Sequence, residues 1–320
     1  MNQRMSITVK VIILVVLAVV FGATMIALSL RSRLPAREDD QTWGSDKKIE
    51  RSFSVQPGGL LDIDADIGSV TTTGTDSGQV TVRVFARGSD ENLRRMHVEF
   101  DQRGTTVRVT ERTDHNYFRF LHDNNMDVHF EVSVPNNFNL RIRTAGGDLK
   151  VVDVKGKIDG ETSGGDLELR KLEGNLRLET SGGNVDAEGL SGDCTCETSG
   201  GSIRAERIQG TSHFNTSGGN IEIRDADGRL VASTSGGDIV ATLKGNQGID
   251  LSTSGGNLTV RLPKATPGDV QAETSGGDVS CDLPFDGKIK DGRMNGRING
   301  GGNLIRLETS GGDILISPMD

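Results

Sequence analysis

The sequence contains few aromatic residues, few cysteines and no excess of positive charge. Aromatic side chains make up 4% of its 320 residues, and its formal net charge is −9. A chain with this charge lacks the basic face that would neutralise the phosphates of a nucleic acid. We therefore expect no nucleic-acid partner.

The three cysteines, Cys194, Cys196 and Cys281, do not indicate a disulfide framework. Cys194 and Cys196 are two residues apart, and the Cα atoms of such a pair in an extended strand stand near the outer limit for a disulfide. We expect all three to behave as small buried side chains. Cysteine usage therefore does not indicate the compartment of the protein.

Glycine, in contrast, is abundant, with 43 residues. Glycine at this level without a collagen-like triplet period suggests turns at regular spacing. The tetrapeptide Thr-Ser-Gly-Gly occurs eight times, and a Thr-Ala-Gly-Gly variant occupies residues 144–147. We interpret the first glycine of each copy as a structural turn position, where glycine permits a positive φ and lets turns stack without Cβ clashes. These glycines are Gly146, Gly164, Gly182, Gly200, Gly218, Gly236, Gly255, Gly276 and Gly311.

Between the turns, apolar residues alternate with polar ones, as at Leu167 and Leu169 and again at Leu176 and Leu178. This alternation indicates two short strands per 18-residue unit, each with one buried face. Stacked units would align their apolar residues in columns. One predicted column is Leu149, Leu167, Val185, Ile203, Ile221, Ile239, Leu258, Val279 and Ile314, and the other is Ile158, Leu176, Cys194, Ser212, Leu230, Ile249, Val270 and Ile305. The predicted fold is all-β, a single β-solenoid over residues 144–320 behind an N-terminal transmembrane helix.

An Asp, Asn or Ser residue follows every turn, for example Asp148, Asp166 and Asn184. We expect these side chains to cap turn amides, because Asn and Asp readily form hydrogen bonds with nearby backbone groups. The alternative interpretation of this polar column is a ladder that binds a ligand.

The N-terminal region contains a long apolar segment. Residues 11–30 carry no charge, and twenty helical residues span about 30 Å, the thickness of a bilayer's hydrocarbon core. We predict a tail (residues 1–10), a transmembrane helix (residues 11–30) and a juxtamembrane linker (residues 31–51). A cleaved signal ending near Ala27–Ser29 is the alternative. The flanking charges do not decide the orientation, and we expect a single-pass membrane protein with an extracytoplasmic solenoid, periplasmic or on the cell surface.

Residues 52–143 also alternate, and we predict irregular first coils with a cap over the N-terminal edge. Ser89 is expected to be the N-cap of a short helix over residues 89–96. Within this region, residues 113–127 concentrate aromatic side chains. We predict either a hairpin tip that packs on the solenoid or a contact loop for lipid or a partner, formed by Tyr117, Phe118, Phe120 and Leu121.

The sequence indicates no cofactor, no metal site and no catalytic residues. A calcium β-roll requires the pattern GGxGxD, whereas the turns here read Gly-Gly-Asp, Gly-Gly-Asn or Gly-Gly-Ser. Carboxylates such as Glu161, Glu179 and Glu197 recur with the repeat and do not form the singular pair of a carbohydrate-cleaving enzyme. The basic, glycine-rich residues 286–303 are expected to be a solvated loop. We therefore predict a protein that is not an enzyme.

These features together carry a resemblance to a known family. They are the apolar N-terminal segment, the opening FSVQPGGLLDIDADIGSVTTTG (residues 53–74), the repeated TSGGD-type turns and the closing LETSGGDILI (residues 307–316). Over roughly residues 52–320 the chain resembles the bacterial family known as "putative adhesins", whose function is unknown. The resemblance implies a β-solenoid in the cell envelope and assigns no catalytic residues.

The leading hypothesis is a non-enzymatic, membrane-anchored β-solenoid of the bacterial cell envelope that acts as an adhesin or as a surface or scaffold binding protein. Its partners would be the membrane and an envelope protein, lipid or glycan. One alternative is an envelope-stress sensor or regulator that recognises lipid or peptide through residues 113–127. Another is a scaffold that self-associates through the last coil, which ends soon after Pro318.

Overall fold

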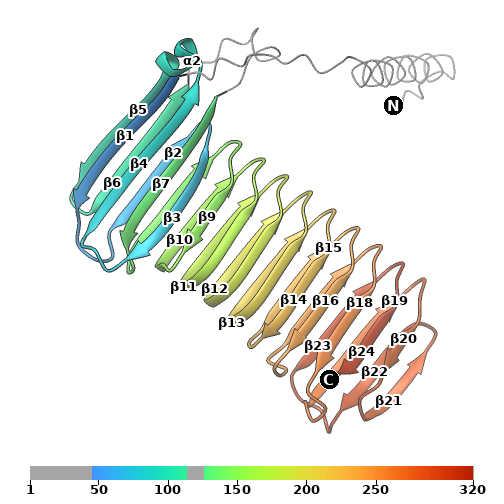
Figure 1. Cartoon of the computed structure of the whole chain (residues 1–320). Coiled ribbons are helices and arrows are strands. Elements are labelled where there is room, and N and C mark those ends of the chain that lie inside the picture. Colours follow the sequence, from blue (N-terminus) through green and yellow to red (C-terminus); the bar gives the residue numbers. More distant parts are fainter. Residues whose placement is uncertain (1–44, 114–125, 320) are drawn as a thin grey trace, which may run out of the picture. The chain divides into compact units, whose positions relative to one another are not determined.

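The computed structural model describes residues 45–113 and 126–319, which contain 24 strands and one short helix (Figure 1). The strands of the N-terminal part are β1 (Ser45–Ser54), β2 (Leu60–Ala65), β3 (Ser69–Thr75), β4 (Gln79–Gly88), β5 (Met96–Arg103), β6 (Thr106–Thr113), β7 (Asp127–Pro135) and β8 (Asn139–Thr144). The central strands are β9 (Leu149–Val152), β10 (Lys155–Thr162), β11 (Leu167–Thr180), β12 (Val185–Thr198), β13 (Ile203–Thr216), β14 (Ile221–Ala226), β15 (Leu230–Thr234), β16 (Ile239–Leu243), β17 (Ile249–Thr253) and β18 (Leu258–Leu262). The last strands are β19 (Gly268–Thr274), β20 (Val279–Cys281), β21 (Phe285–Lys290), β22 (Arg293–Ile298), β23 (Leu304–Thr309) and β24 (Ile314–Pro318).

Hydrogen bonds join all 24 strands in a single sheet, which each coil bends into two faces. Face 1 has the order β1-β4-β7-β3-β9-β11-β12-β13-β14-β16-β18-β24-β20. Face 2 has the order β5-β6-β2-β8-β10-β11-β12-β13-β15-β17-β23-β19-β22-β21. Strands β11, β12 and β13 run through the bend and belong to both faces. The fold is therefore an all-β solenoid-like stack of coils.

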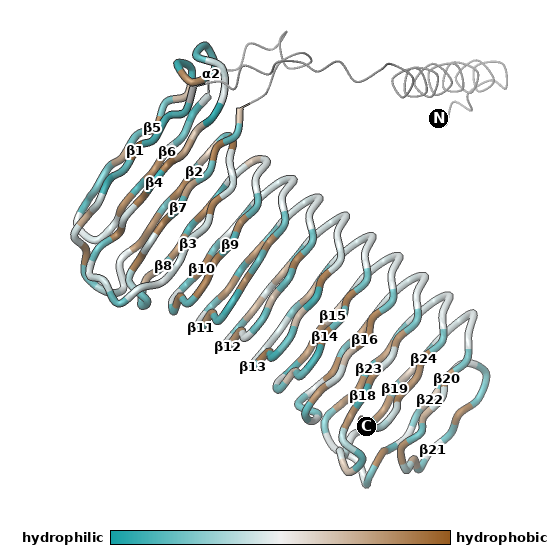
Figure 2. Tube along the Cα trace, viewed as in Figure 1, coloured by the Kyte–Doolittle hydropathy of each residue, from teal (hydrophilic) through white to brown (hydrophobic). Residues whose placement is uncertain are grey.

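The central coils follow the repeat of the sequence. Leu167 of β11 pairs with Leu149 on one side and with Val185 on the other, each eighteen residues away. Leu176 pairs with Ile158 and Cys194 in the same way. All of these side chains are at most 3% exposed, and both predicted columns lie in the interior. Figure 2 shows hydrophobic residues along the strands, whereas the repeated turns are pale.

The turns are held by the threonine and by the second glycine of each TSGG copy. The Thr162 hydroxyl is buried, donates a hydrogen bond to Gly147 O of the preceding coil at 2.7 Å, and accepts one from Gly165 N at 3.4 Å. A Cβ on Gly165 would lie within 3.0 Å of Gly147 O, a separation that real Cβ atoms essentially never show, whereas a Cβ on Gly164 would have its nearest neighbour at 3.9 Å. The close approach predicted for the turn is therefore real, but it falls on the second glycine.

Positive φ angles occur at the opposite corner of the coil, and this corrects one predicted role of the turn glycines. Lys171 has a φ of 53° and Gly174 a φ of 132°, whereas none of the first glycines of the TSGG copies has a positive φ. The chain therefore reverses at the TSGG side without left-handed residues, and it uses them at the corner between the two faces.

At the N-terminal end, spatial order departs from sequence order. Strand β7 lies between β3 and β4, and β8 lies between β2 and β10. Strand β1 begins at Ser45, within the segment that the sequence suggested was a linker. The short helix α2 (Asp90–Arg95) is confirmed, because the Ser89 side chain accepts a hydrogen bond from Asn92 N at the N-cap position.

At the C-terminal end, the last coil is inserted between two earlier ones. Strand β23 pairs with β17 and β19, and β24 pairs with β18 and β20, so the C-terminal strand is not an open edge. The prediction that the last coil ends the stack is wrong. Residues 286–303, expected to be a solvated loop, contribute most of an antiparallel β21–β22 hairpin that pairs with β19. This hairpin, together with β20, ends the stack.

Candidate functional site

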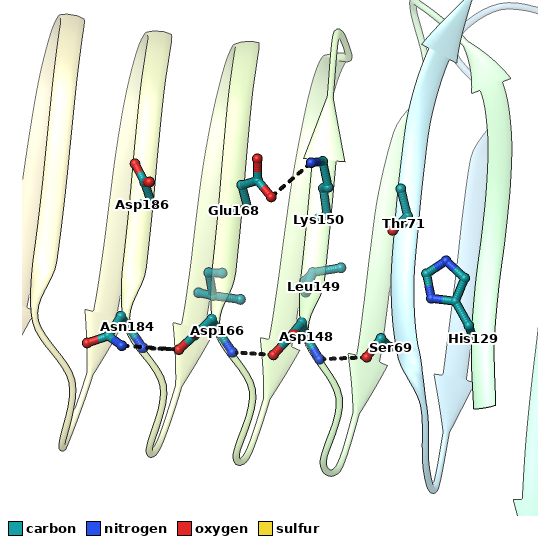
Figure 3. Close-up of a pocket in the computed structure, with 11 residues that line it drawn as sticks. Ser69, Thr71, His129, Asp148, Leu149, Lys150, Asp166, Glu168, Asn184 and Asp186 are labelled. Atoms are coloured by element: carbon teal, nitrogen blue, oxygen red, sulfur yellow. Dashed lines mark hydrogen bonds and ion pairs between the residues drawn. The ribbon is translucent and has the colours of Figure 1, made fainter. Parts of the chain in front are cut away.

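A shallow groove of about 590 Å³ runs along face 1 over the first coils, beside the repeated turns (Figure 3). Its lining comes from β3, β7, β9, β11, β12 and the residues that precede these strands. The side chains along it are mostly charged or hydrogen-bonding, among them His129, Asp148, Lys150, Asp166 and Glu168. Their contacts determine whether they are available to a ligand.

A ladder of hydrogen bonds ties the carboxylates of the groove to the backbone (Figure 3). Asp148 Oδ1 accepts from Asp166 N at 2.9 Å, and Asp166 Oδ1 accepts from Asn184 N at 2.6 Å. The same contact, from one side chain to the amide of the neighbouring coil, continues through Asn184, Ser202, Asn220, Asp238, Asn257, Asp313 and Asp278. The predicted capping is confirmed, although the capped amide belongs to the next coil. One side-chain oxygen of each residue in this series except Asp278, whose amide is the last donor, therefore serves the stacking of coils.

The remaining charges of the groove are paired between coils. Lys150 Nζ lies 2.9 Å from Glu168 Oε2, and the Arg170 guanidinium contacts Asp186 at 3.0 Å and Glu188 at 2.7 Å. The hydrogen bond from Lys150 holds the pKa of Glu168 below its ordinary value, and Arg170 adds to this effect against the opposing effect of burial. The pKa of Glu168 is therefore shifted in the direction opposite to that of a general acid.

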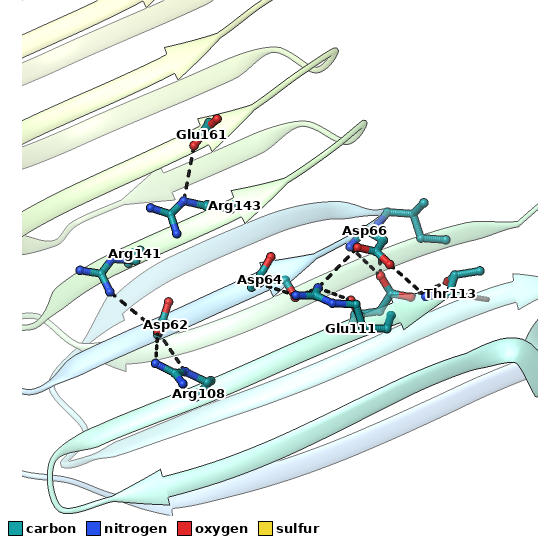
Figure 4. Close-up of polar contacts among 11 residues, drawn as sticks. Asp62, Asp64, Asp66, Arg108, Glu111, Thr113, Arg141, Arg143 and Glu161 are labelled. Atoms are coloured by element: carbon teal, nitrogen blue, oxygen red, sulfur yellow. Dashed lines mark hydrogen bonds and ion pairs between the residues drawn. The ribbon is translucent and has the colours of Figure 1, made fainter. Parts of the chain in front are cut away.

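A second polar cluster lies on the outer surface of face 2 near the N-terminal end (Figure 4). Arg108 donates to Asp62 Oδ2 from Nε at 3.1 Å and from Nη2 at 3.0 Å, and Arg143 lies 3.4 Å from Glu161. The hydrogen bond to Asp64 raises the pKa of Arg112, which also lies near Asp66 and Glu111. These pairs cross from strand to strand and hold β6, β2, β8 and β10 in register.

Glu111 is fully buried within this cluster, and its partners explain why. Its Oε2 accepts hydrogen bonds from Asp66 N at 3.0 Å and Ile67 N at 3.1 Å, and its Oε1 accepts one from the Thr113 hydroxyl at 2.6 Å. The carboxylate therefore closes the first turn of the solenoid, where the sequence has no TSGG. Sequence reasoning missed this residue, because nothing near Glu111 signals a turn 45 residues earlier.

The outer surface of face 2 changes character over the middle coils. Most outward positions of β12, β13, β15 and β17 there carry hydroxyl, amide, imidazole and aliphatic groups, with the carboxylates of Asp193, Glu197 and Asp250 interspersed among them. We call these seven residues the neutral patch: Thr195, Thr211, His213, Asn215, Val231, Ser233 and Ser252. Among them, the Ser233 hydroxyl lies 2.9 Å from Asn215 Oδ1. The patch offers a group of hydrogen-bond donors and acceptors on adjacent coils.

A comparison of the sequence with models of protein families identifies the family of this chain. The Toastrack DUF4097 family model matches residues 60–317. The chain belongs to this family. Among curated proteins, no match to this Toastrack chain was found.

Several solved structures are similar to the Toastrack solenoid at low sequence identity. One is described as a putative lipid binding protein from Parabacteroides distasonis ATCC 8503, with 13% identity, 87% of this chain and 98% of that chain covered, and a TM-score of 0.44. A putative adhesin from the same organism has 12% identity, coverages of 86% and 98%, and a TM-score of 0.41. A putative adhesin from Bacteroides fragilis NCTC 9343 has 15% identity, the same coverages and a TM-score of 0.36.

Some predicted positions of the Toastrack chain lie outside the described residues. These are the apolar segment 11–30 and the candidate contact loop with Tyr117, Phe118, Phe120 and Leu121. Within residues 45–113 and 126–319, no helix is long and apolar enough to span a membrane. In the same part of the chain, no group of three or more His, Cys, Asp or Glu residues is arranged to hold a metal ion.

The cysteines of the Toastrack solenoid are free, as expected. Cys194 and Cys196 are buried with their Sγ atoms 3.5 Å apart, and Cys281 is half-buried. The hydrogen bond with Cys194 and burial raise the pKa of the Cys196 thiol well above its ordinary value. A thiol in this state is a poor nucleophile, so Cys196 acts as a packing group.

Proposed function

We propose that the protein is a non-enzymatic binding protein of the bacterial cell envelope. Residues 11–30 would anchor it in a membrane, and the solenoid would lie on the extracytoplasmic side. The length of the uncharged N-terminal segment supports the anchor. The neutral patch is the observation that carries the binding role, because its seven side chains form no ion pair with a described residue.

The chemistry of the neutral patch favours a hydroxyl-rich ligand such as an envelope glycan. Threonine and serine hydroxyls, the Asn215 amide and the His213 imidazole can exchange hydrogen bonds with sugar hydroxyls. Successive coils present these groups at about 4.8 Å intervals, so an extended polymer could contact several coils. An apolar lipid surface is less suitable, because Ile289 and Leu304 are the large hydrophobic side chains exposed among the described residues, and neither belongs to the patch.

The state of the carboxylates supports a role without catalysis. Asp148 and Asp166 hold the amides of neighbouring coils, and Glu168 is paired with Lys150. A general acid requires a carboxyl group that stays protonated near neutral pH, and the lowered pKa of Glu168 acts in the opposite direction. The repeated carboxylates are consistent with a stacking role.

Sedimentation with purified cell-wall sacculi that retain their attached glycans tests the binding role. The wild-type chain should sediment with the sacculi, and His213→Glu combined with Ser233→Glu should abolish this, because two carboxylates would replace neutral groups of the patch. Thr242→Glu with Thr259→Glu adds the same charge on face 1 and should leave sedimentation unchanged. Equal loss in both variants would show a general charge effect and contradict the proposed patch.

Labelling of an introduced cysteine tests the location. Ser217 lies in an exposed turn, whereas Cys194 and Cys196 are buried. In a Cys281→Ser background, Ser217→Cys should react with a membrane-impermeant maleimide once the outer permeability barrier is opened and the inner membrane is intact. Reaction that requires disruption of the inner membrane would place the solenoid in the cytoplasm and overturn the proposal.

A further inference from the structure

The two ends of face 2 carry edge strands of opposite character. At the C-terminal end, β21 pairs with β22, and no described strand pairs with its other side. At the N-terminal end, β5 pairs with β6 and likewise has no partner strand on its other side among the described residues. Edge strands present unpaired backbone groups that can accept another strand. What each edge accepts depends on its side chains.

The side chains that β21 and β5 direct outward have complementary charges. In β21 these positions are Asp286, Lys288 and Lys290, which pair with outward residues of β22. In β5 they include Glu99, Asp101 and Arg103, which pair with Thr110, Arg108 and Thr106 of β6. In sequence order, the outward residues are acidic, basic and basic along β21, and acidic, acidic and basic along β5. When the two strands run antiparallel, each acidic residue can face a basic one.

The apolar side chains of the two edges are also incompletely covered. Ile289 of β21 lies opposite the buried Met294 on the interior side, yet it is 48% exposed. On β5, Phe100 is half-buried and packs against Phe53 of β1, with ring centroids 6.2 Å apart. Each end of the stack therefore leaves part of its interior layer uncovered by described residues.

We propose that β21 of one copy pairs with β5 of a second copy, so that the solenoids join head to tail. In face 2, β5 runs antiparallel to β6, and two antiparallel steps return β21 to the direction of β19. The new pair is therefore antiparallel. The proposal concerns assembly and stands independently of the glycan-binding role.

In one register of this antiparallel pair, the exposed Ile289 gains an apolar partner and the outward side chains lie opposite residues of opposite charge. Placing Ile289 opposite Phe100 puts Lys290 opposite Glu99, Lys288 opposite Asp101 and Asp286 opposite Arg103. All three outward pairs then have opposite charge, and such cross-strand pairs stabilise a sheet. A shift by two residues toward Val98 sets Asp286 against Asp101, and the opposite shift sets Lys288 against Arg103. Charge therefore selects the one register that also covers Ile289.

The same charges disfavour pairing between like ends. Two β21 strands that match Lys290 with Asp286 place Lys288 against Lys288. Two β5 strands that match Glu99 with Arg103 place Asp101 against Asp101. Contact between unlike ends does not close on itself and yields chains of copies, whereas contact between like ends stops at a dimer. The size distribution thus distinguishes the two arrangements.

Charge reversal at both ends tests the pairing in the purified full chain. Sedimentation velocity over a range of concentrations should show species beyond the dimer for the wild type, with association weakened by added salt. Lys288→Glu with Lys290→Glu should weaken association at least about tenfold, and so should Glu99→Lys with Asp101→Lys. The four substitutions combined in one chain restore opposite charges and should recover association.

A matched control keeps the result specific. Lys157→Glu with Lys244→Glu changes the net charge as the β21 variant does, at exposed central positions that form no ion pair with a described residue, and should leave association unchanged. Circular dichroism checks that each variant is folded. A wild type that is monomeric at all concentrations, or that stops at a dimer, overturns the proposal. Failure of the fourfold variant to recover association while folded also overturns it.

Discussion

The central coils and the two ends of the solenoid obey different rules of pairing. From Lys155 to Leu243, strands pair with their counterparts one repeat before and one repeat after, as Leu167 does with Leu149 and Val185. At the C-terminal end, the coil of β23 and β24 enters between coils that precede it in sequence, and at the N-terminal end β7 enters between β3 and β4. The repeat interval therefore specifies neighbours in the middle but not at the ends.

The difference follows from what each coil has beside it. A central coil is covered above and below by coils of the same length, so the amides and apolar residues of its strands find equivalent partners. An end coil has one such neighbour and would otherwise expose strand edges. Terminal repeats are commonly atypical for this reason. Insertion of the last coil moves the chain terminus away from the edge and leaves the β21–β22 hairpin there.

Deletion of the last coil should have the largest effect on stability. Removal of residues 304–320 eliminates Ile305, Leu307, Ile314 and Ile316, which are fully buried. It also removes β23 from between β17 and β19, and β24 from between β18 and β20. At ~1.5–3 kcal/mol for each side chain, the loss of hydrophobic burial is roughly 6–12 kcal/mol. Urea denaturation of this variant should no longer show one cooperative transition.

Deletion of residues 185–202, one full period, is the matched control for that experiment. It joins Asn184 to Ile203, whose place in the coil equals that of Val185, so the stack can re-form in register. We expect a folded protein with a cooperative transition and a modest fall in its midpoint. An equal loss of stability and cooperativity in the two deletion variants would show that the end coil contributes no more to the fold than a central coil does.

A single methyl group at a turn should have the next largest effect. A Cβ on Gly183 would lie within 3.0 Å of Gly165 O, whereas the nearest neighbour of a Cβ on Gly182 is 3.7 Å away. Gly183→Ala should lower the free energy of unfolding by on the order of 3 kcal/mol, because the coils must separate to admit the methyl group. Gly182→Ala should cost less than about 1 kcal/mol. Similar losses measured by urea denaturation would contradict the assignment of the close approach.

The polar ladder should contribute less per residue. Asp166→Ala leaves Asn184 N without its acceptor and should cost about 1 kcal/mol, as loss of a hydrogen bond typically does. Asp166→Asn keeps an acceptor oxygen and removes repulsion with the neighbouring Asp148. Its stability should equal or exceed that of the wild type. A destabilised Asn variant would show that charge, and not hydrogen bonding, governs the ladder.

Surface charge pairs should matter least, and their effect depends on pH. The pKa of Glu168 is lowered in the folded state, chiefly by Lys150. The pairing therefore stabilises the fold above the ordinary pKa of a glutamate, and this stabilisation is lost as the pH falls through the lowered value. Lys150→Met should flatten the decline in stability between roughly pH 5 and pH 3 by less than about 1 kcal/mol, because both side chains are partly exposed to solvent. Lys157→Met, which removes no ion pair with a described residue, should leave the pH profile unchanged.

The candidate site was only partly foreseen from the sequence. The ladder side chains after each turn were evident, since they recur at the repeat interval. Glu111 was not, because it lies 45 residues from the turn that it closes. The neutral patch also escaped notice, because its members are unremarkable singly and become a surface when Thr195, His213 and Val231 are aligned by stacking.

The sequence by itself determined the coil, its strands, its inward columns and the threonine and glycine of its turn, because each of these depends on residues within one repeat of one another. Tertiary structure alone decided which coil lies last and which strands form the edges. The apolar columns permit either order, since Ile249 and Val270 both match Ile305 in register. Closing the ends of the stack depends on contacts between distant segments, which no local pattern encodes.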